Sequence, residues 1–281
     1  LSAVDEAATM NVLCVDKTGT LTENELRVAA AVPLGDIATP ELLLWARLAS
    51  SDGGLDPVDA AVRAAFTGQG ATQGSAQGST NGNSFDGQRR LAFVPFDPAT
   101  KMAEATVTAA DGTQRRVVKG AFAHVAAMSG GSAAAEMKAA ELAAGGYRVL
   151  GVSLSDANST TMRIIGLIAL SDPPRAEAAD CIATLQAMGV HVLMVTGDAP
   201  ATAASVANAI GLKGKVFPPG PIPETLDANE YAVFAGVLPE DKYALVKALQ
   251  RSGYSVGMCG DGANDAPALR QAQLGIAVST S

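Results

Sequence analysis

The sequence predicts an α/β protein in which a doubly wound parallel sheet is interrupted by an inserted mixed α/β domain. Three short apolar runs, at residues 11–15, 190–195 and 254–259, each end in a polar loop that contains glycine. Segments with helical periodicity precede the second and third runs, and this alternation is typical of parallel sheets. The middle of the chain has several short strand-like stretches instead, which indicates a separate domain.

The apolar runs are predicted to be strands of the parallel sheet, because short, continuously apolar segments are typical of strands buried on both faces. A helix is predicted to begin at Pro173 and Pro174, which suit a first turn, and to end before Gly189. Two more helices are predicted at residues 199–210 and 239–251, each followed closely by glycine.

Residues 29–161 are predicted to form the inserted domain. Its strands are expected at residues 90–95, 101–109, 114–118 and 148–154, and its helices at 40–49, 57–66 and 133–144. Residues 67–84 contain no charged and no large apolar side chain, so a flexible loop is expected there. The parallel-sheet domain is then discontinuous and consists of residues 1–28 and 162–281.

Composition narrows the class of protein. The 281 residues suffice for two domains, and with 48% apolar and 17% charged residues general disorder is excluded. The formal net charge of -8 argues against a nucleic-acid partner. No apolar run approaches the ~20 residues that span a bilayer, so this segment by itself is expected to be soluble. Three scattered cysteines indicate neither a disulfide framework nor a zinc site.

The first polar loop carries the strongest motif, DKTGTLT at residues 16–22. A carboxylate at the end of a buried strand, here Asp16, can attack phosphorus as a nucleophile if a cation lies nearby. Gly19 allows a sharp turn whose N–H groups can bind phosphate oxygens. Because ligands bind at the carboxyl ends of parallel strands, the three polar loops are expected to converge on one site.

The last loop, GDGANDAPA at residues 260–268, contains two carboxylates four residues apart. Asp261 and Asp265 suit Mg²⁺, which prefers oxygen ligands and keeps several waters. Asn264 can donate to phosphate. Taken alone, this pair of carboxylates fits an ordinary loop as well as it fits a metal site.

Two further features complete the predicted site. Thr196 and Gly197 offer a hydroxyl and an N–H at a helix start, where phosphate binds well. Lys242, near the start of another predicted helix, can supply the cation that the nucleophile needs. Each feature alone is more typical of a helix cap or a solvated lysine, and it is their combination at the ends of one sheet that predicts phosphoryl chemistry.

The motifs DKTGTLT, TGD (196–198) and GDGANDAPAL (260–269), in this order, resemble the signature of P-type ATPases of the haloacid-dehalogenase-like superfamily. The segments at 119–121 and 172–175 also match, and the resemblance covers nearly the whole chain. Segments 93–101 and 233–243 are most similar to the plasma-membrane proton-pump branch. The resemblance implies a haloacid-dehalogenase-like (Rossmannoid) phosphorylation domain with an inserted nucleotide-binding domain.

The resemblance also implies roles for residues of the parallel-sheet domain. Asp16 would be phosphorylated, and Mg²⁺ would be held by Asp16, the carbonyl of Thr18 and Asp261, with support from Asp265. The phosphoryl group would be bound by Thr196, Gly197, Lys242 and Asn264.

In the inserted domain the resemblance implies a nucleotide pocket. Phe96 would stack on adenine, and Lys101 and Lys119 would line the pocket. Arg148 and Arg175 would approach phosphates or bridge the two domains, whereas Asp56 and Asp59 would lie near the base. The family usually continues KGA with Pro-Glu, but Phe122 and Ala123 follow here, so a different pocket rim is expected.

Thr18 indicates the reaction class. Superfamily phosphatases usually place a second Asp two positions after the nucleophile as the general acid and base, and threonine cannot take that proton at neutral pH. An aspartyl-phosphate is therefore expected to persist, as a pump requires.

The resulting hypothesis is the catalytic cytoplasmic segment of a P-type ATPase, most similar to a proton pump, with ATP as substrate and Mg²⁺ as cofactor. Its partners would be transmembrane and actuator domains that the sequence lacks. It would be located on the cytoplasmic side of the membrane. Two alternatives stay open: a free-standing soluble phosphatase or phosphotransferase, and a nucleotide-binding module without catalysis.

Overall fold

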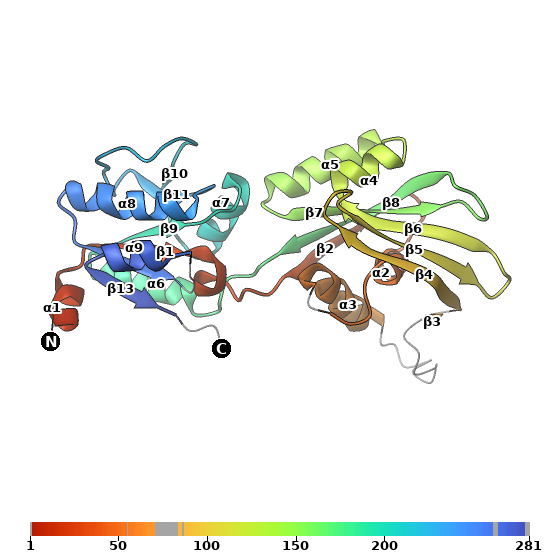
Figure 1. Cartoon of the computed structure of the whole chain (residues 1–281), viewed down its shortest axis with the longest axis horizontal. Coiled ribbons are helices and arrows are strands. Elements are labelled where there is room, and N and C mark those ends of the chain that lie inside the picture. Colours follow the sequence, from red (N-terminus) through yellow and green to blue (C-terminus); the bar gives the residue numbers. More distant parts are fainter. Residues whose placement is uncertain (1, 55, 71–83, 86, 261–263, 279–281) are drawn as a thin grey trace. The chain divides into compact units, whose positions relative to one another are not determined.

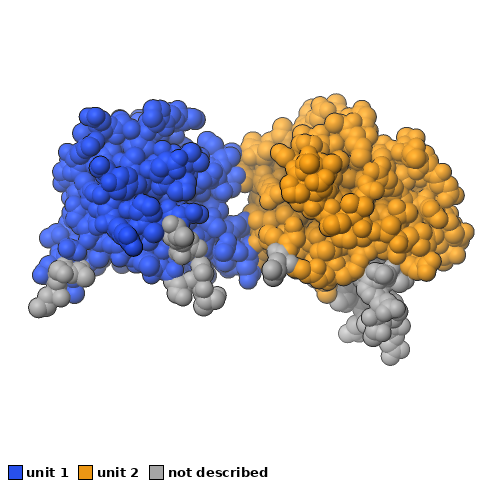
Figure 2. Space-filling view, in the orientation of Figure 1, with its two compact units in different colours: residues 1–25, 172–281 blue, residues 26–171 orange. Residues whose placement is uncertain are grey.

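The structure is a computed structural model of the chain, and it describes all residues except 1, 55, 71–83, 86, 261–263 and 279–281 (Figure 1). The chain forms two compact units (Figure 2). Unit 1 comprises residues 1–25 and 172–281, and unit 2 comprises residues 26–171. Within the described ranges, no helix is both long and apolar enough to cross a membrane.

Unit 1 is built on a six-stranded parallel sheet with the order β10-β11-β9-β1-β12-β13. The strands are β1 (Val12–Asp16), β9 (His191–Val195), β10 (Lys215–Val216), β11 (Tyr231–Phe234), β12 (Val256–Gly260) and β13 (Leu274–Ala277). Its helices are α1 (Ser2–Thr9), α6 (Ala178–Ala187), α7 (Pro200–Ala209), α8 (Pro239–Arg251) and α9 (Ala266–Gln271). A turn, η1 (Lys17–Leu21), follows β1, and the backbone of Thr18 and Gly19 within it is not helical.

The side chains of the central strands alternate between two cores, one on each face of this sheet. Cys14 of β1 packs in the cluster that contains residues of α8 and α9. Its neighbours Leu13 and Val15 pack in the cluster that contains residues of α6 and α7. Helices therefore cover both faces, and the predicted doubly wound parallel sheet is confirmed.

Unit 2 is built on a seven-stranded antiparallel sheet with the order β2-β8-β7-β6-β5-β4-β3. The strands are β2 (Arg27–Pro33), β3 (Ser84–Phe85), β4 (Gln88–Asp97), β5 (Met102–Ala109), β6 (Gln114–Ala121), β7 (Arg148–Ser155) and β8 (Met162–Ser171). Its helices are α2 (Thr39–Leu48), α3 (Pro57–Gly70), α4 (Phe122–Met128) and α5 (Ala133–Ala144). The largest core lies between α2, α3 and the sheet, and smaller clusters include residues of α4 and α5.

The structure moves the predicted boundaries between the domains. The sequence interpretation assigned residues 162–281 to the parallel-sheet domain, but β8 pairs antiparallel with β2 and β7 and belongs to unit 2. The run MRIIGLIALS is as apolar as a parallel strand because both of its faces are covered, so its composition does not reveal its partners. The boundary at residue 28 likewise moves to 25, because β2 pairs with β8.

The predicted loop at 67–84 also begins later than expected. Helix α3 continues to Gly70, and β3 begins at Ser84. The intervening residues 71–83 lie outside the described part of the chain.

Candidate functional site

The carboxyl ends of β1, β9 and β12 lie at one edge of the parallel sheet. In register, Asp16 at the end of β1 lies opposite Val195, the residue before Thr196. Val15 lies opposite Cys259, the residue before Gly260. The three polar loops that the sequence analysis singled out therefore start side by side at this edge of the sheet.

Lys242 joins two of the predicted carboxylates at this edge. Its ammonium donates a hydrogen bond to Asp16 and a second, 2.7 Å long, to Oδ1 of Asp265. All three residues are buried, with 6%, 7% and 2% of Asp16, Lys242 and Asp265 exposed. Burial by itself lowers the pKa of Lys242, but the hydrogen bonds and charges of the two carboxylates outweigh it and raise the pKa. Lys242 is therefore a cation at neutral pH.

A second buried lysine lies beside the nucleophile, and the sequence analysis did not single it out. Nζ of Lys17 is 2.9 Å from Oδ2 of Asp198 and 3.6 Å from Oδ2 of Asp172. The hydroxyl of Thr22 donates to Oδ2 of Asp172 over 2.6 Å. Lys17 could have been noticed in the sequence, because it directly follows Asp16. Its partners Asp172 and Asp198, however, are distant in the chain.

The turn after Asp16 is stabilised by a hydrogen bond from Arg175, a residue distant in the sequence. Gly19 has a φ of +74°, in the left-handed region that glycine tolerates. Its carbonyl accepts a 2.9 Å hydrogen bond from Nη2 of Arg175. The resemblance placed Arg175 near phosphates or between domains, whereas here its guanidinium supports the η1 turn. The buried hydroxyl of Thr20 has no hydrogen-bond partner among the described residues.

The Thr196–Asp198 turn is tied to the neighbouring strand and loop. The N–H of Thr196 donates to the carbonyl of Phe234, and its own carbonyl accepts from Val237. Its side-chain hydroxyl accepts a 3.1 Å hydrogen bond from the N–H of Asp198. Thr196 is 2% exposed, and Gly197 follows it in the loop.

The predicted Mg²⁺ ligands are described only in part. Asp261 lies outside the described residues, and Asn264, just beyond this gap, is exposed. In the ranges that are described, no three acidic, imidazole or thiol side chains come together as metal ligands. Asp16 and Asp265 nevertheless meet on one ammonium, and this oxygen-only donor pair suits Mg²⁺.

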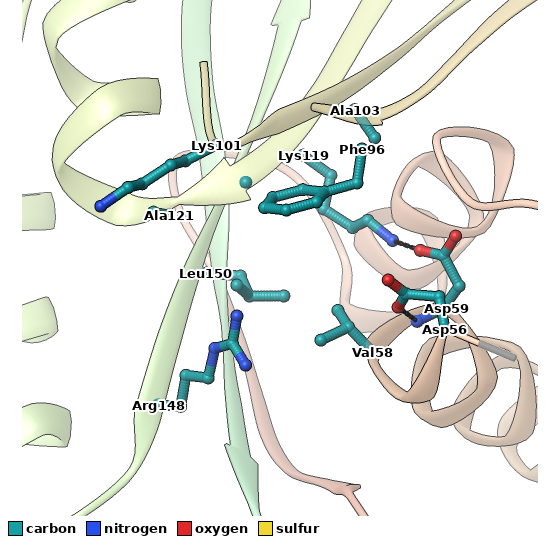
Figure 3. Close-up of a pocket in the computed structure, with 11 residues that line it drawn as sticks. Asp56, Val58, Asp59, Phe96, Lys101, Ala103, Lys119, Ala121, Arg148 and Leu150 are labelled. Atoms are coloured by element: carbon teal, nitrogen blue, oxygen red, sulfur yellow. Dashed lines mark hydrogen bonds and ion pairs between the residues drawn. The ribbon is translucent and has the colours of Figure 1, made fainter. Parts of the chain in front are cut away.

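Unit 2 contains a separate pocket of about 90 Å³ (Figure 3). It is lined by Asp56, Val58 and Asp59 of the α3 start, by Phe96 and Lys101, and by Ala103, Lys119, Gly120, Ala121, Arg148 and Leu150 of β5, β6 and β7. The six residues that the resemblance assigned to the inserted domain, Asp56, Asp59, Phe96, Lys101, Lys119 and Arg148, are therefore brought together here.

The pocket has an aromatic side and a charged side. Phe96 is 43% exposed, which leaves much of its ring free to stack. Lys119 is 3% exposed, and its ammonium forms hydrogen bonds with Asp59 and with the hydroxyl of Ser50. Burial lowers the pKa of Lys119, although the charge of Asp59 opposes this effect. Burial would raise the pKa of Asp59, but the charge and hydrogen bond of Lys119, together with hydrogen bonds from Ser51, outweigh it, and that pKa is lowered.

A glycine shapes the pocket wall between Lys119 and Ala121. A Cβ atom built on Gly120 would lie 2.8 Å from Cα of Met102 and closer still to the carbonyl of Lys101. These obstacles are backbone atoms, which cannot turn aside. Gly120 therefore permits β5 and β6 to meet closely where they border the pocket.

Comparison with known proteins places this architecture. Residues 10–273 match the haloacid dehalogenase-like hydrolase family. A putative cation-transporting ATPase of Methanocaldococcus jannaschii is 33% identical over 100% of this chain and 35% of its own length. A probable plasma membrane ATPase of Dictyostelium discoideum is 37% identical over 99% of this chain and 27% of its own length.

The solved structures that are similar to this chain include ATPases, as the sequence relatives do. The crystal structure of a zinc-transporting PIB-type ATPase in the E2·Pi state superimposes with a TM-score of 0.69 at 29% identity. The match covers 98% of this chain and 37% of that one. This chain thus spans about a third of the length of the proteins it matches.

Proposed function

This chain belongs to the haloacid dehalogenase-like hydrolase family, and because its relatives there are P-type ATPases, we propose that it forms an aspartyl-phosphate on Asp16 from ATP. The observation that carries the proposal is the contact of the buried Lys242 ammonium with Asp16. An ammonium in this place offsets the repulsion between a carboxylate and a phosphoryl group that both carry negative charge.

The proposed reaction is an in-line phosphoryl transfer. An oxygen of the Asp16 carboxylate attacks the γ-phosphorus of ATP, the bond to the bridging oxygen breaks, and ADP leaves. Thr196, Gly197 and Asn264 are proposed to hold the transferred group through a hydroxyl, an N–H and an amide. Thr18 cannot act as the general base that activates water, so the acyl phosphate would persist.

The proposed cofactor is Mg²⁺. Asp16, the carbonyl of Thr18 and Asp261 would hold it, with Asp265 in support, and oxygen ligands of this kind suit it. When bound, Mg²⁺ supplies charge neutralisation for the phosphate oxygens. Lys242 keeps the two buried carboxylates close together, so their charge is available at that position.

The unit 2 pocket is the proposed nucleotide site. The exposed ring of Phe96 suits stacking with adenine, which typically contributes about 1–3 kcal/mol per base. Lys101, Lys119 and Arg148 supply positive charge toward a polyphosphate. Asp56 and Asp59 lie at the start of α3, where Asp59 contacts the ammonium of Lys119.

We further propose that the full-length protein is a cation pump, and more narrowly a proton pump. The similarity of segments 93–101 and 233–243 to plasma-membrane proton pumps supports this choice, as do relatives named plasma membrane ATPases in Dictyostelium discoideum and Schizosaccharomyces pombe. The chain would then work on the cytoplasmic side of a membrane, together with transmembrane and actuator domains.

The test is a phosphorylation assay with γ-labelled ATP and Mg²⁺. We expect a protein-bound label that hydroxylamine removes, that Asp16→Asn abolishes, and that the matched exposed control Asp180→Asn retains. A chain that binds ATP but takes up no label would contradict the proposed transfer. Steady release of phosphate from small phosphomonoesters would favour a free-standing phosphatase instead.

A further inference from the structure

In the ion pair of Asp59 and Lys119, the carboxylate of Asp59 is buried and hydrogen-bonded through both of its oxygens. One oxygen of Asp59 contacts the ammonium of Lys119, and the other accepts a 2.9 Å hydrogen bond from the N–H of Ser51. Only 5% of Asp59 is exposed. Asp59 borders the pocket, but burial leaves little of its carboxylate within reach of a ligand.

Lys119 differs from Asp59, because its ammonium can still donate a hydrogen bond to a ligand. An ammonium has three hydrogens. The described structure gives two acceptors to that of Lys119, a carboxylate oxygen of Asp59 and Oγ of Ser50. The third hydrogen remains for a ligand in the pocket that Lys119 lines.

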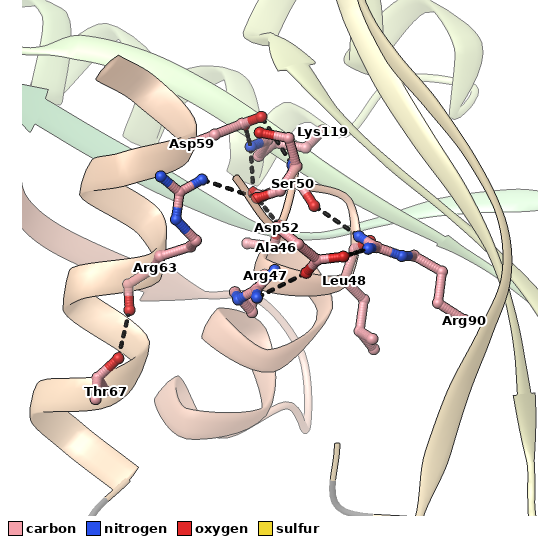
Figure 4. Close-up of polar contacts among 11 residues, drawn as sticks. Ala46, Arg47, Leu48, Ser50, Asp52, Asp59, Arg63, Thr67, Arg90 and Lys119 are labelled. Carbon is pink, nitrogen blue, oxygen red and sulfur yellow. Dashed lines mark hydrogen bonds and ion pairs between the residues drawn. The ribbon is translucent and has the colours of Figure 1, made fainter. Parts of the chain in front are cut away.

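The chain segment behind this pair is held from three directions (Figure 4). Oγ of Ser50 donates 2.8 Å to the carbonyl of Ala46, so Ser50 is fixed to the end of α2. Arg63 of α3 donates 2.8 Å to the carbonyl of Ser51. Arg90 of β4 donates 2.7 Å to the carbonyl of Ser50. These donors immobilise the two serines that accept from Lys119 or donate to Asp59.

The same segment carries a second ion pair, in which the side chains of two arginines are largely buried and the carboxylate is exposed. The carboxylate of Asp52 contacts both Arg47 and Arg90, and the Arg47 contact is 2.8 Å long. Arg90 thus connects the strand that carries Phe96 to the loop that carries Ser50. The aromatic and the cationic sides of the pocket are therefore built on one polar network.

We propose that Asp59 is a positioning residue that acts on nucleotide affinity through Lys119 and does not contact the nucleotide itself. This inference rests on the proposed nucleotide site. A buried ammonium without a counter-ion either loses its proton or turns toward water. Asp59 and Ser50 keep the Lys119 ammonium charged and fix its orientation in the pocket. Removing either of them is therefore expected to weaken the contact between Lys119 and the nucleotide.

Asp56 differs from Asp59 in its exposure and in its contacts. It is half-buried, and one of its oxygens accepts a 2.9 Å hydrogen bond from the N–H of Asp59 at the start of α3. Its other oxygen has no hydrogen bond among the described residues, so Asp56 is the acidic residue that can meet a donor on the base.

A double-mutant cycle on the 281-residue chain tests the inference. ATP affinity is measured by calorimetry without Mg²⁺, so that binding is separated from transfer, for Asp59→Asn, Lys119→Met and their combination. Each single substitution should weaken binding about tenfold, the loss expected for one charge-assisted hydrogen bond, and the double substitution should weaken it no further. The exposed Asp36→Asn is the matched control and should bind as the wild type does.

Ser50→Ala provides a second measurement if Asp59→Asn does not fold. It removes one acceptor of Lys119 and leaves the charge pair, so a loss of about threefold is expected. Losses that multiply in the double variant would overturn the inference, because Asp59 would then contact ATP independently. Unchanged affinity in Asp59→Asn or in Ser50→Ala would also overturn it. A wild-type chain that does not bind ATP would overturn the proposed nucleotide site as well.

Discussion

Lys242 donates a hydrogen bond of 2.7 Å to Asp265, and the same ammonium contacts the carboxylate of Asp16. One cation therefore serves two buried acids. Asp16 is the last residue of β1, Asp265 directly precedes α9, and the lysine comes from the first turn of α8. These three side chains together carry one net negative charge, which favours an additional cation.

Replacing Lys242 with methionine is expected to destabilise unit 1. Two buried carboxylates would lose their counter-ion, which typically costs about 3–5 kcal/mol. Hydrogen exchange of the β1 and β12 amides measures the change, and unchanged protection of these amides in Lys242→Met would contradict this account.

In the wild-type protein, the stability contributed by Lys242 should depend on pH only in the alkaline range. The pKa of Lys242 in the folded state is raised above the ordinary 10.5. Its contribution to stability is therefore fully present below pH 10.5 and is lost as the pH rises through the folded-state pKa. We expect no loss from this group between neutral pH and about pH 9 in the same exchange measurement.

Two threonines of the first motif are expected to respond differently to replacement by valine. Thr22 is fully buried and donates 2.6 Å to Asp172, so Thr22→Val should destabilise unit 1 by about 1–3 kcal/mol. The buried hydroxyl of Thr20 has no partner in the described structure, so Thr20→Val should change stability by less than about 0.5 kcal/mol. Denaturant titrations of both variants test the contrast, and equal losses would refute it.

Gly120→Ala is expected to damage the nucleotide pocket and the sheet together. Its new Cβ would meet the backbone of Lys101 and Met102, so unit 2 should lose about 1–3 kcal/mol. The control is Gly53→Ala, where nothing lies within 4 Å of the new atom. Trp45, the single tryptophan of the chain, is buried in unit 2, and its fluorescence follows unfolding of that unit. Similar stability of the two variants would rule out the predicted clash.

Phe96→Ala is expected to weaken ATP binding by about 1–3 kcal/mol, the usual contribution of base stacking. Leu91→Ala is a matched control on the same strand, because Leu91 is exposed to a similar extent and does not line the pocket. Titration of both variants with ATP gives the comparison. Unchanged affinity in Phe96→Ala would remove stacking from the proposed site.

Much of the catalytic edge could be predicted because it depends on local order in the chain. A buried strand that ends in Asp16, and others that end before Thr196 and Asp261, must bring their loops to one edge once the strands are parallel. The contact between Lys242 and Asp16 could be expected on chemical grounds, since a nucleophilic carboxylate needs a cation. Its geometry required the structure.

The contacts that could not be predicted join residues that are far apart in sequence. The hydrogen bond between Thr22 and Asp172 spans 150 positions, and no local pattern specifies such a partner. The same holds for β8, whose apolar residues suit either sheet. Its hydrogen-bond partners β2 and β7 assign it to unit 2.

The sequence alone determined the doubly wound sheet, the order of the motifs and the side chains that can perform phosphoryl chemistry. These follow from periodicity and from residue type, which are properties of short segments. Only the tertiary structure decided which other charges meet: Lys17 with Asp198, Lys119 with Asp59, and Lys242 with Asp265 in addition to Asp16. A buried ammonium must find a counter-ion to stay charged, and packing decides which carboxylate lies within its reach.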